Sequence, residues 1–172
     1  MPDDVVVRCE LRTGVELDRP LARSLARELR QAKALGTAAR ALRGRPLSEE
    51  RLRQRLRMRG IPENVGDAAV GMLSAAGYVD DARLARGRAS ALAERGWGDG
   101  AILTRLAAEG LPQAEVAAAV AELEAEAVRA APLAFGTDRR KAWSLLQRRG
   151  FDMETIETVL GQLDETGPDG LG

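Results

Sequence analysis

The amino-acid sequence predicts a mainly α-helical protein. The expected architecture is a tandem repeat of three three-helix units, elongated or curved, preceded by a small β-hairpin and a helix. Aromatic residues make up only 3% of a chain that is 45% hydrophobic, so its core must consist largely of Leu, Val and Ala, which suits close helix packing. Leucines recur at helical spacing along most of the chain, and a helix–glycine–helix pattern occurs three times.

The first segment is the only one with a β-like pattern. Val5–Leu17 contains β-branched residues and then Thr13-Gly14, which predicts a small hairpin that turns near these two residues. Because an isolated two-stranded hairpin is marginally stable, it is expected to lean on the helices. A helix is predicted to start near Pro20, with Asp18 as its cap.

Helical spacing continues after this start, with leucines at positions 21, 25 and 29. Gly36 is predicted to interrupt the helix, and Thr37–Gly44 to form a second one. The turn that follows ends at Ser48, a good N-cap, and Glu49 and Glu50 suit the positive end of a helix dipole. The remainder of the chain is predicted to be nearly all helix, punctuated by glycines.

The repeat is best seen by aligning the chain on three glycines, Gly60, Gly110 and Gly150. Relative to these glycines, leucine stands four positions before (Leu56, Leu106, Leu146), a large apolar residue one position after (Ile61, Leu111, Phe151), and a helix-starting residue two positions after (Pro62, Pro112, Asp152). Each unit is therefore expected to contain a left-handed glycine stop and an apolar residue that fills the corner. The alternative is a helical bundle in which these similarities arise by chance.

The repeat predicts the organisation of the chain. Residues 1–33 form an N-terminal extension, residues 34–79, 80–121 and 122–165 form the three three-helix units, and residues 166–172 form a flexible tail. The helix upstream of each corner is expected at Thr37–Gly44, Asp81–Arg95 and roughly Glu122–Ala131.

Composition excludes several classes of function. Cys9 is the only cysteine, so no internal disulfide can form, which indicates a reducing, cytoplasmic environment. The chain has no histidine, which removes the usual general base and the commonest metal ligand, so neither catalysis nor a metal or other cofactor is expected. No apolar run approaches a membrane span, and "MPDDVVVRCEL" does not resemble a signal peptide.

Charge is unevenly distributed although the formal net charge is zero. Residues 40–60 contain eight arginines and two acids, and residues 137–150 contain five bases and one acid. Residues 61–81 contain four acids and no base, and residues 151–172 contain six acids and no base. Either these segments are solvated helix faces that pair with one another, or they form a directional binding surface.

Three stretches stand out along the chain: "RPLSEERLRQRLRMRGI" (45–61), "AGYVDDARLARGRASALAERGWG" (76–98) and "LLQRRGFDMETIETVL" (145–160). They resemble the three unit signatures of the RecX family of recombination regulators, in the order in which these occur in that family. The resemblance spans about residues 37–163. It implies a non-enzymatic modulator, expected to be a monomer, that lies along the filament of RecA recombinase on DNA and limits its growth, ATP turnover and strand exchange. The corresponding processes are DNA repair, homologous recombination and the SOS response.

Eight arginines are the candidate contacts with the filament or with DNA. The DNA can be single- or double-stranded, and the chain alone is expected to bind it weakly. Arg51, Arg55 and Arg59 lie four residues apart and share one helix side, where they can contact phosphates or an acidic groove. The other candidates are Arg86 in the middle unit and four residues around the last corner: Arg139, Arg140, Arg148 and Arg149. For this last group, neutralisation of the acidic helix Asp152–Asp164 is the alternative role.

Other polar and aromatic residues have simpler structural explanations. Asp80 and Asp81 precede a helix, so N-capping is favoured over an acid pair or a metal site. Tyr78 is expected to pack in a corner. Trp97 and Trp143 could stack on bases but are expected to anchor the packing.

The main alternative function is that of a helix-turn-helix DNA-binding regulator, since helix–glycine–helix corners and basic helices occur there too. Such a protein needs base-reading polar side chains on its recognition helix. The helices after the three corner glycines are apolar or acidic, which argues against this class. A helical-repeat scaffold is the remaining alternative.

Overall fold

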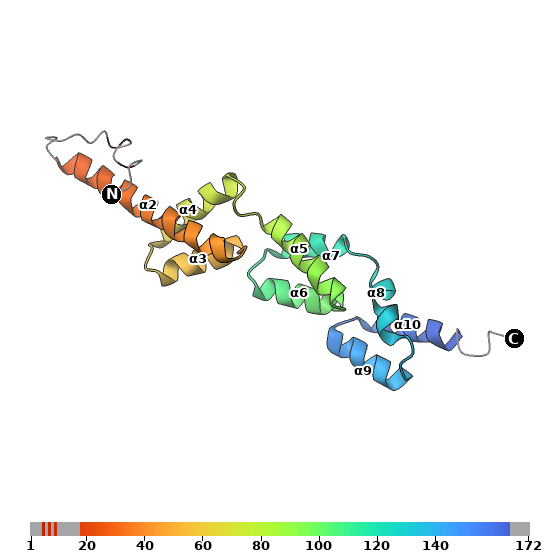
Figure 1. The fold of residues 1–172 in the computed structure, drawn as a ribbon. Coiled ribbons are helices and arrows are strands. Elements are labelled where there is room, and N and C mark those ends of the chain that lie inside the picture. The colour runs from red at the N-terminus through yellow and green to blue at the C-terminus, as the bar shows by residue number, and fades with distance from the viewer. Residues whose placement is uncertain (1–4, 6, 8, 10–17, 166–172) are drawn as a thin grey trace. The chain divides into compact units, whose positions relative to one another are not determined.

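The structure, a computed structural model, describes residues 5, 7, 9 and 18–165 (Figure 1). Within this part of the chain the regular structure is entirely helical, as the composition predicts. The helices are α2 (Arg19–Gly44), α3 (Glu49–Met58), α4 (Glu63–Ala75), α5 (Asp81–Glu94), α6 (Asp99–Ala108), α7 (Gln113–Ala121), α8 (Glu126–Ala134), α9 (Arg139–Arg149) and α10 (Met153–Glu165).

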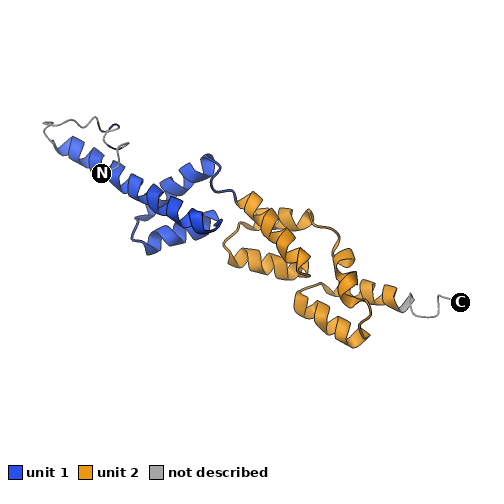
Figure 2. Cartoon of the chain, in the orientation of Figure 1, with its two compact units in different colours: residues 1–80 blue, residues 81–172 orange. Residues whose placement is uncertain are grey.

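The chain divides into two compact units, residues 1–80 and residues 81–172 (Figure 2). In unit 1, helices α2, α3 and α4 all contact one another around a single hydrophobic cluster. Leu52 and Leu56 of α3 and Val70 of α4 are at most 1% exposed in this cluster. Burial of such side chains contributes roughly 2 kcal/mol each, so α3 and α4 depend on the long helix α2 as their common support.

Unit 2 contains two hydrophobic clusters instead of one. Helices α5–α7 surround the first, with Ile102 and Leu106 fully buried, and helices α8–α10 surround the second, with Leu146 and Phe151 inside. We refer to these sets as the α5–α7 group and the α8–α10 group. Because each group has its own core, the contact between the groups is made by residues outside these two clusters of buried side chains.

Alanine pairs bring the helices of each group close together. The first helix of each group carries two fully buried alanines four residues apart: Ala34 and Ala38 in α2, Ala85 and Ala89 in α5, and Ala130 and Ala134 in α8. Residues four apart lie on the same helix face, and a methyl side chain allows a neighbouring helix to approach closely. The six alanines of these pairs therefore lie where helices pack against one another.

The three corner glycines adopt the predicted left-handed conformation. Gly60, Gly110 and Gly150 have φ values of 71°, 75° and 79°. The following residues Ile61, Leu111 and Phe151 are at most 6% exposed, and their amides donate to the carbonyls of the three leucines five residues earlier, at 3.1, 3.3 and 3.2 Å. This is the Schellman arrangement, which closes one helix while fixing the path into the next.

The predicted β-hairpin at Val5–Leu17 is not supported. Val5 and Val7 are helical, and the amide of Cys9 donates to the carbonyl of Val5 at 3.0 Å, the four-residue spacing of a helix. The rest of the expected hairpin and the expected tail at 166–172 lie outside the described residues. A short β-branched run cannot by itself distinguish strand from helix, because its neighbours decide which backbone groups find partners.

The predicted interruption at Gly36 is wrong. Helix α2 runs without a break from Arg19 to Gly44, so the helix expected at Thr37–Gly44 is its last part. A glycine inside a helix costs only about 1 kcal/mol relative to alanine, and burial of Ala34 and Ala38 on either side offsets this cost. The caps are as predicted: the amide of Leu21 donates to Asp18 at 2.8 Å, and that of Arg51 to Ser48 at 3.3 Å.

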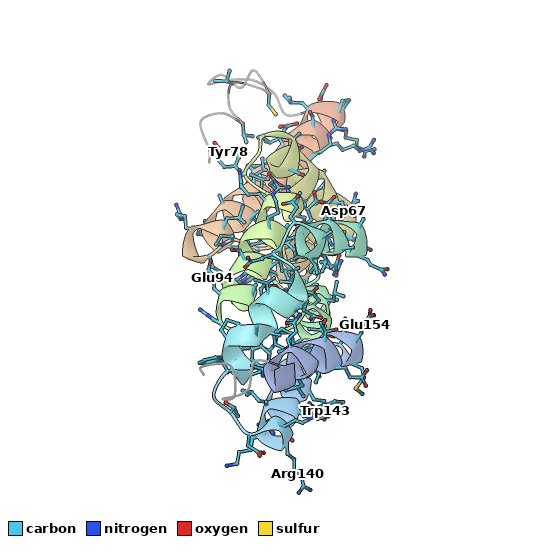
Figure 3. The ribbon with its side chains drawn as sticks, turned by 90° about the vertical axis from the view of Figure 1, so that its right-hand side faces the viewer. Asp67, Tyr78, Glu94, Arg140, Trp143 and Glu154 are labelled. Carbon is cyan, nitrogen blue, oxygen red and sulfur yellow. The ribbon has the colours of Figure 1, made fainter. Side chains whose placement is uncertain are left out.

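Two further expectations differ from the structure. The helix predicted at Glu122–Ala131 begins four residues later, as α8, because Glu122 is the C-cap of α7. Tyr78, labelled in Figure 3, is 71% exposed and not a packed corner residue; the neighbouring Val79 is buried in its place. Trp97 and Trp143 are half-buried against the clusters of their groups, as expected of packing anchors.

Candidate functional site

Helix α3 presents a row of arginines on its outer side. The Ser48 hydroxyl caps the helix, and Leu52 and Leu56 hold one face against the unit 1 core. These contacts place Arg51, Arg55 and Arg59 on exposed surface, with Arg51 donating to Gln54 at 3.3 Å. Among the residues the structure describes, Arg55 and Arg59 make no ion pair. We call Arg51, Arg55 and Arg59 the α3 ridge.

The other two arginines of α3 are neutralised within unit 1. Arg53 contacts Glu49 at 2.6 Å and Asp67 at 3.3 Å. Arg57 contacts Glu50 at 2.9 Å and Glu63 at 3.9 Å. The pairing of Arg53 and Arg57 with acidic residues separates them from the α3 ridge, and a count of charges along the sequence cannot make this division.

These contacts also change the acidity of the two glutamates. A hydrogen bond with Ser74, followed by that with Arg53, lowers the pKa of Glu49 below its usual value. A hydrogen bond from Arg57, followed by that from Gln54, lowers the pKa of Glu50. Both carboxylates are therefore charged at neutral pH and neutralise Arg53 and Arg57, the two paired arginines of α3.

The candidates in unit 2 fall into different environments. Arg86 lies exposed on α5, without an ion pair to any described residue, whereas Arg88 pairs with Glu109 at 3.3 Å. On α9, Arg140 projects outward (Figure 3) and Arg148 is also exposed. Arg139 instead donates to the carbonyl of Leu160 at 3.3 Å, near the C-terminal part of α10. Arg86, Arg140 and Arg148 are thus available for a partner.

Arg149 is turned inward, unlike its neighbour Arg148. Its guanidinium donates to the carbonyl of Arg95 at 2.5 Å and lies 5.1 Å from the centre of the Trp97 ring. The guanidinium of Arg105 also contacts this ring, at 3.8 Å. Cation–π contacts of this kind contribute roughly 0.5–1 kcal/mol each when exposed. Arg149 therefore joins the α8–α10 group to the α5–α7 group.

Glu126 and Arg129 of α8, two residues that no sequence pattern indicates, make the main polar contact between the groups. The Glu126 carboxylate accepts from the amide of Asp99 at 2.5 Å, and its second oxygen accepts from the Thr155 hydroxyl at 3.0 Å and the amide of Asp152 at 3.4 Å. Arg129, whose side chain is 8% exposed, donates to the carbonyls of Glu124 and Trp97 at 2.8 and 3.0 Å and forms an ion pair with Asp99. We call these contacts of Glu126 and Arg129 the α8 junction.

Two glycines bring the turn before α6 close to the corner between α9 and α10, beside the α8 junction. The amide of Gly98 donates to the carbonyl of Arg149 at 2.8 Å. A Cβ atom on Gly98 would lie 2.5 Å from the carbonyl atoms of Gly150, and one on Gly150 would lie 2.5 Å from the Cβ of Ala101. Only glycine permits such an approach, so the "GWGDG" stretch is a packing surface for the last corner.

Residues of α8 and α10, together with Phe135, form an apolar depression. It is lined by Ala127, Val128, Ala131, Pro132, Phe135, Gln162 and Leu163. Val128 is 52% exposed and Phe135 79% exposed.

Across the described ranges, no group of three or more His, Cys, Asp or Glu residues is placed to hold a metal ion.

Comparison with known proteins decides the family. No protein-family model matches the chain. The regulatory protein RecX of Stenotrophomonas maltophilia strain K279a is 36% identical over 135 residues, which cover 72% of this chain and 80% of that protein. The chain belongs to the RecX family. Regulatory protein RecX of Xanthomonas campestris pv. campestris strain B100 is likewise 36% identical, over 72% of this chain and 81% of that protein.

Solved RecX structures share the fold. A crystal structure of regulatory protein RecX superposes with a TM-score of 0.77 and 22% identity, covering 91% of this chain and 84% of that one. The crystal structure of RecX from Lactobacillus salivarius gives 0.71 and 17%, covering 79% and 97%. The resemblance found in the sequence is therefore confirmed, and this RecX-family chain has an all-helical fold in its described part.

The structure sorts the eight predicted arginines of this RecX-family chain. Arg55, Arg59, Arg86, Arg140 and Arg148 are exposed and make no ion pair within residues 18–165 whose side chains are described. Arg51 is exposed with a Gln54 contact, Arg139 contacts α10, and Arg149 contacts the α5–α7 group. No helix among those described combines the length and apolar character that a bilayer span requires.

Proposed function

We propose that this RecX-family chain is a non-enzymatic cytoplasmic regulator that binds the RecA–DNA filament as a monomer. Binding limits filament growth, ATP hydrolysis and strand exchange, in the context of recombination, DNA repair and the SOS response. Membership of a family of regulatory proteins supports a regulatory role. The exposed arginines of the α3 ridge support a binding surface on unit 1.

The proposed architecture is the three tandem three-helix units at residues 34–79, 80–121 and 122–165. Three hydrophobic clusters, each shared by three consecutive helices, support this division. A protein of separate small units can place one contact on each of several successive sites of a repetitive partner. Affinity then comes from several weak contacts acting together, as in other multivalent binders.

Exposed guanidinium groups are the proposed contacts, on the α3 ridge, Arg86, Arg140 and Arg148. A guanidinium binds phosphate or carboxylate oxygens through paired hydrogen bonds, so it suits both the DNA backbone and acidic protein side chains. Because the chain as a whole is neutral, binding to DNA alone is expected to be weak and to fall steeply with salt.

The decisive experiment measures DNA-dependent ATP hydrolysis by RecA as the purified chain is added. The wild-type chain is expected to slow hydrolysis. The double variant Arg55→Glu/Arg59→Glu should raise the half-inhibitory concentration about tenfold, equivalent to about 1.4 kcal/mol of binding free energy. Arg27→Glu/Arg30→Glu is the matched control, because it reverses two exposed charges on α2, outside the proposed contacts.

Two results would contradict the proposal. Unchanged hydrolysis at saturating wild-type chain would remove RecA as the target. Equal loss of inhibition in the α2 control would show that overall charge matters and the α3 ridge does not. Unchanged hydrolysis together with tight binding to one duplex sequence would instead support a helix-turn-helix regulator.

A further inference from the structure

The α8 junction connects two groups of helices that have separate hydrophobic cores. The fully buried apolar side chains belong to one cluster or the other. The closest contacts between the groups are mainly polar: hydrogen bonds, an ion pair and the cation–π contact of Arg149 with Trp97. Close backbone packing at Gly98 and Gly150 and the Leu133 side chain beside Gly96 complete them. Hydrogen bonds depend on direction as well as distance, so such a junction fixes the orientation of the groups more narrowly than apolar contact alone.

Glu126 replaces a missing helix cap. Helix α6 begins after Gly98, which has no side chain to cap it. The Glu126 carboxylate accepts from the first amide of α6, while its second oxygen accepts from Asp152 and Thr155 at the start of α10. One carboxylate therefore satisfies the N-termini of two helices in different groups, where helix dipoles also favour negative charge.

Arg129 completes the junction from the next turn of α8. Its guanidinium contacts three separate segments: the loop before α8, the turn before α6 and the first residue of α6. The side chain is almost fully buried, so each lost contact would leave a polar group without a partner. The planar fork of arginine can make these three contacts at once, whereas lysine offers a single nitrogen.

We propose that Glu126 and Arg129 are positioning residues that lock the α5–α7 group to the α8–α10 group, so that unit 2 meets its partner as one rigid body. The lock holds Arg86 on α5 at a fixed spacing from Arg140 and Arg148 on α9. That these arginines then meet the RecA–DNA filament rests on the proposed function; the lock itself does not. Fixed spacing raises the effective concentration of the second contact once the first has formed.

The lock is tested by pulsed electron–electron spin resonance on the full chain, with Cys9 replaced by alanine. Spin labels on Ala107→Cys (α6) and Thr158→Cys (α10) report the spacing between the groups, and both positions are exposed. The wild-type junction should give a narrow distance distribution. Glu126→Gln/Arg129→Met should broaden it, because an amide has one acceptor oxygen where Glu126 uses two.

Matched controls separate loss of the lock from loss of folding. Labels on Ala107→Cys and Ala117→Cys lie within one group, so their distribution should stay narrow in the double variant. Glu122→Gln removes an exposed carboxylate that makes no hydrogen bond or ion pair with the described residues of α6 or α10, and should change nothing. Arg129→Lys, which keeps the charge, should give intermediate broadening, and it serves as the test variant if Arg129→Met does not fold.

The functional arm measures RecA inhibition with the same variants. Glu126→Gln/Arg129→Met should raise the half-inhibitory concentration about tenfold while helicity is unchanged. A distribution that is broad in the wild type, or unaltered in the double variant, would overturn the lock. Broadening without loss of inhibition would overturn its role in positioning. If the wild-type chain does not inhibit RecA, the proposed function fails, and the resonance measurement still decides the lock.

Discussion

The starts of α3 in unit 1 and α6 in unit 2 occupy the same place in the repeat but are built differently. Ser48 and Gly98 each stand twelve residues before a corner glycine. Ser48 is 2% exposed and caps α3 with its own hydroxyl, whereas Gly98 leaves α6 to be capped by Glu126. The surroundings thus decide which residue suits this position. Ser48 supplies a local cap, whereas Gly98 leaves room for the backbone of Gly150 and Phe151.

The corners at Gly60 and Gly150 show the same contrast. Both have positive φ and the same Schellman hydrogen bonds. A Cβ on Gly60 would meet nothing within 4 Å, while one on Gly150 would lie 2.5 Å from the Cβ and 2.7 Å from the amide nitrogen of Ala101. Gly60 serves backbone conformation alone, and Gly150 also serves packing between two groups of helices.

The largest effect is expected from alanine at these two corners. Gly150→Ala combines left-handed strain with overlap against α6 and should lower the free energy of unfolding of unit 2 by about 4 kcal/mol. Gly60→Ala has only the strain and should cost about 1 kcal/mol. Urea unfolding followed by circular dichroism measures both, and tryptophan fluorescence isolates unit 2, since both tryptophans lie there. Equal costs at the two corners would remove the distinction.

Gly98→Ala should have the next largest effect. Its Cβ would overlap backbone atoms of Gly150 and Phe151, which cannot rotate away as a side chain can, so we expect a loss of about 3 kcal/mol. Gly87→Ala is the matched control, because Gly87 lies inside α5 with nothing within 4 Å of its Cβ position and should gain about 1 kcal/mol. Fluorescence of Trp97 in a Trp143→Phe background would report both. A stabilised Gly98→Ala would contradict the close packing.

The corners were predictable because everything that forms them is local. The glycine, the leucine four residues before and the apolar residue one after can be read within six residues of sequence. The α8 junction was not predictable, since Arg129 and Glu126 find their partners some thirty residues away and look like ordinary surface charges in the sequence. The sequence signal for this junction was Gly98. Ser48 and Asp138, at the same place in the other repeats, have side chains that cap their helices, whereas glycine has none, so another residue has to cap α6.

The arginines also show that local sequence predicts exposure but not contacts with distant residues. Helical spacing correctly placed Arg51, Arg55 and Arg59 on one exposed side of α3. Spacing could not separate Arg148 from Arg149, because which of two adjacent residues faces a neighbour depends on where that neighbour packs. The error at Gly36 has the opposite origin: a local helix-breaking signal was outweighed by burial of the alanines around it.

A smaller effect is expected from the caps themselves. Ser48→Ala removes the acceptor for the Arg51 amide and should lower the stability of unit 1 by about 1 kcal/mol. Ser48→Asp should retain most of the stability, because a carboxylate also caps a helix and favours its positive end. Circular dichroism during urea unfolding measures both variants. A neutral Ser48→Ala would mean that α3 does not depend on its cap and would weaken the contrast with α6.

The smallest expected effect is the pH dependence of unit 1. Hydrogen bonds lower the folded-state pKa of Glu49 and Glu50 below the ordinary value of 4.5. Their contribution to stability is therefore fully present above that value and is lost as pH falls through the lower folded-state pKa. The loss should be a few tenths of a kcal/mol for each partly exposed pair.

The measurement is urea unfolding of unit 1 by circular dichroism at a series of pH values below about 6. The Glu49 and Glu50 contributions are present at the upper end of this series and decrease as the pH falls below 4.5 towards the lowered folded-state pKa. Arg57→Gln removes the main partner of Glu50 and should flatten the dependence, whereas Arg27→Gln on α2 should leave it unchanged. In unit 2, Asp152 provides the counterpart, since a hydrogen bond from the Thr155 amide lowers its pKa. If Arg57→Gln unfolds with the wild-type pH dependence, the ion pair of Arg57 with Glu50 does not stabilise unit 1. The stabilising role that separates Arg57 from the α3 ridge would then be wrong.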